Sequence, residues 1–93
     1  MYVLGAVLPG VPPAAVKAGR HMALAMNEAE RALSGKRCFV AKRALGRAWD
    51  RYLGLMRERT VARLPSQDEG SRSLLMRLVR LRVAYRKTCG GEP

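Results

Sequence analysis

Three arginines at regular spacing are the residues of this chain whose type and position could do chemistry. Arg43, Arg47 and Arg51 follow one another at i, i+4 and i+8, which places them on one face of a helix. Like charges at that spacing repel each other, whereas a guanidinium is well suited to bind the oxygens of a phosphate. We therefore interpret the row as a surface for the phosphate backbone of a nucleic acid. The alternative interpretation is a solvated face that only keeps a small protein in solution.

The charge of the chain is strongly positive and is concentrated around these arginines. The 93 residues include 18 Lys and Arg against seven Asp and Glu, a formal net charge of +11. Residues 36–64 carry a net +7, residues 1–35 only +1 and residues 65–93 +3. Arginine outnumbers lysine fourteen to four, which the codon bias of a GC-rich genome would explain equally well. That bias does not explain the excess of basic over acidic residues, so the net charge itself indicates an anionic partner.

A turn at Ser34-Gly35-Lys36-Arg37 adds two cations at the start of the second predicted helix. The first N–H groups of a helix lack partners within it and carry the positive end of its dipole, so cations there mildly disfavour the helix unless an anion binds. Exposed cations also tolerate this position at small cost, and that alternative stays open. The predicted nucleic-acid contacts are Lys36, Arg37, Arg43, Arg47 and Arg51, with Arg59 and Arg63 as secondary candidates.

The elements that must position these residues are helices. Apolar residues recur every three or four positions over three stretches, which predicts helices at about 12–34, 38–64 and 71–88. Pro12-Pro13 can open the first helix, Ser34-Gly35 supplies a left-handed stop, and Pro65 ends the second. We predict an all-α fold, an antiparallel three-helix bundle over 12–93 with an extended N-terminal arm at 1–11. An open arrangement, with the third helix docked on a partner, is the alternative.

The second and third helices differ in the residues that they leave for the surface. On the second, Trp49 and Tyr52 belong to the apolar stripe, whereas Arg59 and Arg63 occupy the same angular positions beyond Met56. The last two turns are therefore expected to project past the bundle or to meet something other than its core. The third helix is apolar on more than one side. We predict a partner interface there, made of Leu75, Met76, Val79, Arg82, Val83 and Arg86.

Nothing in the residue types indicates catalysis. His21 is the sole histidine, and the acidic residues pair most simply with basic residues three or four positions away. We expect no enzymatic activity, no metal and no cofactor. Trp49, Tyr52 and Tyr85 fall on predicted core stripes, which leaves Tyr2 as the aromatic residue free to stack on a base. Contacts to the nucleic-acid backbone are therefore expected in place of base readout.

The two cysteines are expected at the same end of the bundle, since Cys38 begins the second helix and Cys89 ends the third. A disulfide would fit that geometry, but the apolar stretch 1–11 makes a poor signal peptide and the cytosol keeps thiols reduced. We therefore predict two free thiols and a cytoplasmic location, in the host cytoplasm if the protein is viral. The same stretch is too short to span a bilayer, so no membrane association is expected.

Two functional hypotheses follow from this pattern. The leading one is a small basic protein that binds RNA or DNA through phosphates, without sequence-specific base readout, at the nucleoid or in a ribonucleoprotein. The alternative is a protein-binding module, such as a phage-encoded regulator or inhibitor of a host protein. It would meet an acidic partner through the third helix and a basic face, and a homodimer through the third helix is a variant of the same idea.

Overall fold

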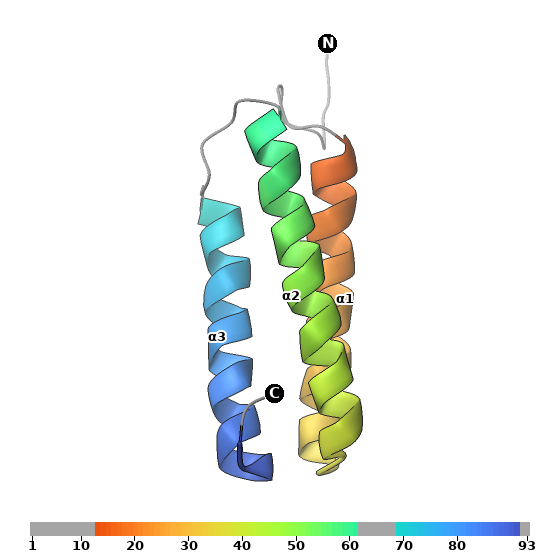
Figure 1. Cartoon of the computed structure of the whole chain (residues 1–93), viewed down its shortest axis with the longest axis vertical. Helices are drawn as coiled ribbons and strands as arrows, with labels where there is room; N and C mark the ends of the chain where they lie inside the picture. Colours follow the sequence, from red (N-terminus) through yellow and green to blue (C-terminus); the bar gives the residue numbers. More distant parts are fainter. Residues whose placement is uncertain (1–12, 62–68, 92–93) are drawn as a thin grey trace.

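Three helices make up the part of the chain that the structure describes. The computed structural model describes residues 13–61 and 69–91, which contain α1 (Pro13–Ser34), α2 (Cys38–Val61) and α3 (Glu69–Cys89). Helices α1 and α3 run in one direction and α2 in the other (Figure 1), which confirms the predicted all-α, antiparallel three-helix bundle. The predicted arm at 1–11 lies outside the described residues.

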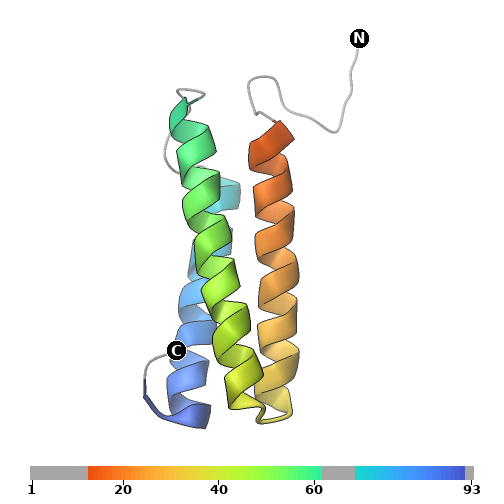
Figure 2. The same ribbon diagram turned by 45° about the vertical axis from the view of Figure 1, so that its right-hand side comes forward.

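Helices α1 and α2 form the tighter pair of the bundle. They lie side by side along their length in both views (Figures 1 and 2). Small side chains let two helix axes approach closely, because little volume separates the backbones. The buried alanines of this core are Ala25, Ala29 and Ala32 on α1, and Ala41, Ala44 and Ala48 on α2. Met22 and Met26, both fully buried, supply the larger side chains of α1.

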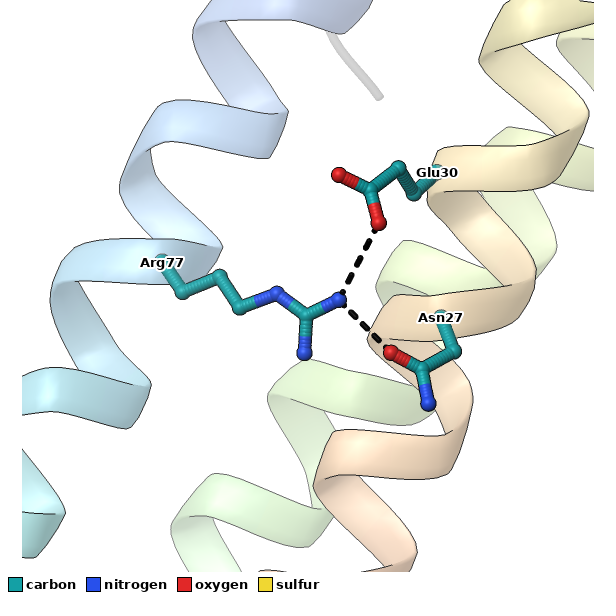
Figure 3. A network of polar contacts seen from close by, with 3 residues as sticks. All are labelled: Asn27, Glu30 and Arg77. Atoms are coloured by element: carbon teal, nitrogen blue, oxygen red, sulfur yellow. Dashed lines mark hydrogen bonds and ion pairs between the residues drawn. The ribbon is translucent and has the colours of Figure 1, made fainter.

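Helix α3 closes the bundle with larger apolar residues but packs less closely. Leu78, Leu81 and Tyr85 enter the common core, yet α3 makes far fewer contacts with either neighbour than α1 and α2 make with each other. A polar contact also joins α3 to α1. Arg77 Nη2 donates to Asn27 Oδ1 at 2.7 Å and lies 3.3 Å from Glu30 Oε1 (Figure 3).

A disulfide between Cys38 and Cys89 joins α2 to α3, so the prediction of two free thiols is wrong. The predicted placement of the two residues is confirmed, because the start of α2 and the end of α3 meet at one end of the bundle with 5.8 Å between the Cα atoms. A reducing compartment would favour free thiols, but the two cysteines lie at the separation that a disulfide requires. The bond ties the last residue of α3 to the first residue of α2. It therefore holds α3 at the end of the bundle opposite to the end of α2 and the start of α3.

The turn between α1 and α2 is tight, and its left-handed residue is Lys36, not the glycine that the sequence suggested. Lys36 has a φ of 55°. The Arg37 N–H donates to the Ala32 carbonyl at 2.8 Å, and the Lys36 N–H donates to the Leu33 carbonyl at 3.0 Å. These two nested bonds form a Schellman motif, in which the residue after the helix adopts the left-handed conformation. A lysine therefore occupies a position that favours glycine.

Two predicted side-chain environments on α2 are wrong. Arg59 is 5% exposed, so α2 does not project past the bundle at this residue. The alternative, that these turns meet something other than the core, stays a prediction. Arg59 continues the buried stripe after Leu55, its hydrocarbon stem can pack among apolar residues, and it has an interacting partner. Trp49 was placed in the core but is 41% exposed, because α3 does not close over that edge of α2. Arg63 lies outside the described residues.

Candidate nucleic-acid interface

The arginine row predicted on α2 is exposed along its whole length. Arg43, Arg47 and Arg51 all point to solvent. They stand roughly 6 Å apart along the helix axis, since four residues rise by that amount. The row borders α1 on the side of the bundle away from α3, as the cleft-lining residues show. We call this surface the arginine face: Arg43, Arg47 and Arg51 with the neighbouring α1 residues His21 and Glu28.

Two shallow clefts follow the seam between α1 and α2 on the arginine face. One of about 300 Å³ is lined by residues of both helices, among them His21, Arg47 and Arg51. The next, of about 260 Å³, is lined by Val40, Glu28, Arg43 and Arg47. Guanidinium groups therefore line a continuous concave strip. A strip of this kind can hold a run of anionic groups more closely than a convex helix surface can.

One acidic residue lies inside the arginine face. Glu28 on α1 forms an ion pair and a hydrogen bond with Arg47 on α2, and the two side chains are about equally exposed. An exposed pair of this type contributes at most about 1 kcal/mol to stability. The same pair competes with any external anion for Arg47. Glu28 therefore offsets part of the positive charge of the arginine face and orients the central guanidinium.

The turn residues Lys36 and Arg37 extend the positive surface to the start of α2. Both are exposed. The Arg37 carbonyl accepts the first helical hydrogen bond, from the Ala41 N–H at 2.9 Å, so Arg37 is the N-cap residue. An arginine side chain has no acceptor oxygen to cap the free N–H groups that follow. No acidic residue lies in the first turn of α2 either, so an external anion fits this end.

Phe39 is a surface residue that the sequence analysis passed over. Its side chain is 70% exposed, and the Arg43 guanidinium carbon lies 5.8 Å from the centre of its ring. The signal was present in the sequence, because Phe39 does not share the angular position of the buried alanines Ala41 and Ala44. An exposed ring beside an arginine is a platform on which an unpaired base can stack. Tyr2, the aromatic residue predicted for that role, lies outside the described residues.

The predicted partner interface on α3 lies on another side of the bundle. Met76, Val79 and Val83 are each more than two-fifths exposed. Leu75 and Arg82 are half-buried, and Arg86 is exposed. A groove of about 410 Å³ runs between this side of α3 and α2, lined by Lys42, Leu45, Gly46, Trp49 and Arg82. The arginine face and this groove do not share a lining residue.

Comparisons with known proteins add no further assignment. No protein-family model, curated protein or solved structure matches the chain. Within residues 13–61 and 69–91, no three His, Cys, Asp or Glu side chains gather to hold a metal ion. None of the three described helices combines the length and the apolar character needed to cross a membrane. The geometry of the surfaces is therefore what supports a function.

Proposed function

We propose that this protein is a nucleic-acid-binding protein, and not an enzyme, that contacts the phosphate backbone through the arginine face and the turn beside it. The observation that carries the proposal is the exposed row Arg43, Arg47 and Arg51, in which like charges lie four residues apart along a concave seam. Lys36 and Arg37 continue the row past the start of α2. The driving force is Coulombic attraction together with the release of counterions from the nucleic acid.

The contacts are expected to be independent of base sequence. Arginine and lysine reach phosphates from any sequence, and a phosphate contact carries no sequence information by itself. Phe39 adds a stacking surface that accepts any unpaired base. The same set of residues would serve RNA or DNA. Single strands gain the additional stacking contact.

Salt dependence tests the proposal directly. Fluorescence anisotropy with a duplex DNA, a single-stranded DNA and a structured RNA, each titrated from low to physiological salt, should show binding in every case. If about six phosphates are neutralised on duplex DNA, log K against log salt should fall with a slope near −5. Binding that vanishes by physiological salt would contradict the proposal, because the positive charge of the protein would then be incidental to nucleic-acid binding.

A charge-matched pair of variants separates the arginine face from net charge alone. Replacing Arg43, Arg47 and Arg51 together by glutamine should lower the magnitude of the salt slope by about 3, one phosphate contact for each arginine. All three are exposed, so the fold should be retained. Equal loss of binding in a control variant that lacks three cations on α3 would refute the assignment to this face.

The control removes the same charge from the outer side of α3. Arg72, Arg80 and Lys87 are exposed there, and none of them lines a cleft on the arginine face. Replacing these three by glutamine should weaken binding only through the general reduction of positive potential. The salt slope should then stay close to that of the unchanged protein.

The proposed location is the cytoplasm, at the nucleoid or in a ribonucleoprotein, where nucleic acid is found. The Cys38–Cys89 disulfide is unusual there, because cytosolic reductants keep most thiols reduced. Thiol alkylation of rapidly quenched cells, followed by mass spectrometry, reports the state of both cysteines. A pair that is reduced in growing cells would agree with this location and would mean that the bond forms only under oxidising conditions. A pair that stays oxidised in the cell would contradict the location.

A further inference from the structure

A second surface, the groove between α2 and α3, is unused by the proposed function. Trp49 and Leu45 form its apolar side on α2, and Gly46 leaves it open, since no atom lies within 4 Å of the position where a Cβ would be. Along α2, exposed Leu53 continues the apolar strip one turn beyond Trp49. Lys42 and Arg82 stand at its edges. The lining thus combines an apolar floor with a cationic rim.

Exposed apolar residues of α3 border this surface at Val79. Val79 lies three positions before Arg82, so it belongs to the same side of α3. Met76 and Val83 lie three before and four after Val79, which makes a continuous stripe at helical spacing. A strip of this kind beside a groove matches the way an amphipathic helix is bound, with apolar anchors at i, i+3 or i+4 and i+7.

We propose that the α2–α3 groove binds an amphipathic helix of another protein, with an apolar stripe flanked by acidic residues. Charge complementarity selects this occupant. The lining contains two cations and no acidic side chain, and α3 as a whole carries six basic residues against one acidic. A second copy of the same chain would bring a further net +11 against this rim, which disfavours a homodimer through the groove. Trp49 is the anchor, since buried tryptophan dominates interfaces of this type.

The sole tryptophan of the chain lies in this groove, so its fluorescence reports occupancy. The probe is a synthetic helical peptide without tryptophan, with leucines at i, i+3, i+4 and i+7 and glutamates on the flanking positions. Titration should shift Trp49 emission to shorter wavelength and reach saturation. A peptide of the same composition with scrambled leucine positions should bind at least tenfold more weakly, a difference of about 1.4 kcal/mol.

Two helical glycines of α2 provide a matched pair of variants. Gly46→Phe fills the groove, and Gly54→Phe places the same side chain on the same helix outside the groove lining. At neither position does a neighbouring side chain or another helix lie within 4 Å of the added Cβ. Phenylalanine also has a higher helix propensity than glycine, so both variants should fold. Gly46→Phe should weaken binding of the probe peptide at least tenfold, and Gly54→Phe should leave the affinity within about twofold of that of the unchanged protein.

The outcomes are decisive in either direction. A saturable emission shift that Gly46→Phe removes and Gly54→Phe retains supports the inference. It is overturned by equal binding of the scrambled peptide, by an emission shift that depends only on protein concentration, as a homodimer would give, or by displacement of the peptide by duplex DNA. The inference does not depend on the proposed function, because loss of nucleic-acid binding at the arginine face leaves this groove unchanged.

Discussion

Removal of the Cys38–Cys89 disulfide should take away a large part of the stability of this bundle. The bond joins residues 51 positions apart and closes a loop that contains the whole of α2 and α3. In the chain-entropy treatment, a loop of that size stabilises the folded state by about 4 kcal/mol at 25 °C. Small domains have a total stability of roughly 5–15 kcal/mol. Roughly 1–11 kcal/mol should therefore remain after reduction, and a bundle at the lower end of that range would be only marginally folded.

The assay compares three samples by circular dichroism during thermal and urea unfolding. They are the oxidised protein, the same protein in a thiol-free reductant, and the double variant Cys38→Ser/Cys89→Ser. A loss of about 4 kcal/mol corresponds to a fall in Tm of roughly 15–30 °C, at about 4–8 °C for each kcal/mol in a domain of this size. The reduced protein and the double variant should agree, because both lack only the cross-link.

Two results would refute this reasoning. A loss of unfolding free energy below about 1 kcal/mol would mean that reduction adds little conformational entropy to the unfolded chain, contrary to the loop-closure argument. A stepwise transition, in which part of the helical signal disappears before the main one, would mean that the bond only holds α3 in place. The tighter packing of α1 with α2 than of either with α3 makes that second outcome the informative one.

Three further predictions concern single side chains. Lys36→Gly should raise the free energy of unfolding by about 1 kcal/mol, because glycine adopts the left-handed conformation without a Cβ clash, and urea titration measures it; an unchanged midpoint would contradict the turn assignment. Glu28→Gln should tighten nucleic-acid binding in anisotropy titrations by releasing Arg47 from its ion pair, whereas weaker binding would show that Glu28 serves mainly to orient the guanidinium. Phe39→Ala should weaken the binding of single-stranded DNA by about 1–3 kcal/mol and the binding of duplex DNA much less. Equal losses of binding free energy on the two forms of DNA would exclude stacking.

The contact between α3 and α1 could not be predicted from the chain alone. Arg77 is one of five arginines on α3, and only the packing of the helices brings this one to Asn27 Oδ1. Its position relative to α1 depends on the rotation of α3 about its own axis. Helical periodicity defines which residues share a face, but it does not say which neighbour that face meets. Exposure of Trp49 and burial of Arg59 were missed for the same reason.

The left-handed turn shows a related limit on a smaller scale. Ser34-Gly35 is a clear stop signal, and α1 does end at Ser34. Which residue adopts the positive φ depends on where the nested hydrogen bonds to Ala32 and Leu33 close. A shift of one residue is enough to move that conformation from Gly35 to Lys36. Composition indicates that a turn occurs, whereas hydrogen-bond geometry decides its register.

Helical periodicity and the Pro and Gly residues near the helix ends by themselves determined three helices and their antiparallel order. They also determined the exposed row at Arg43, Arg47 and Arg51, because all these features depend on residues close together in the chain. Tertiary structure alone decided that the row borders a concave seam with α1 and that a separate groove opens beside Trp49. It also decided that Cys38 and Cys89 are bonded. The seam depends on how closely α1 and α2 pack, whereas the groove and the bond depend on the distance and rotation at which α3 packs on the other two helices.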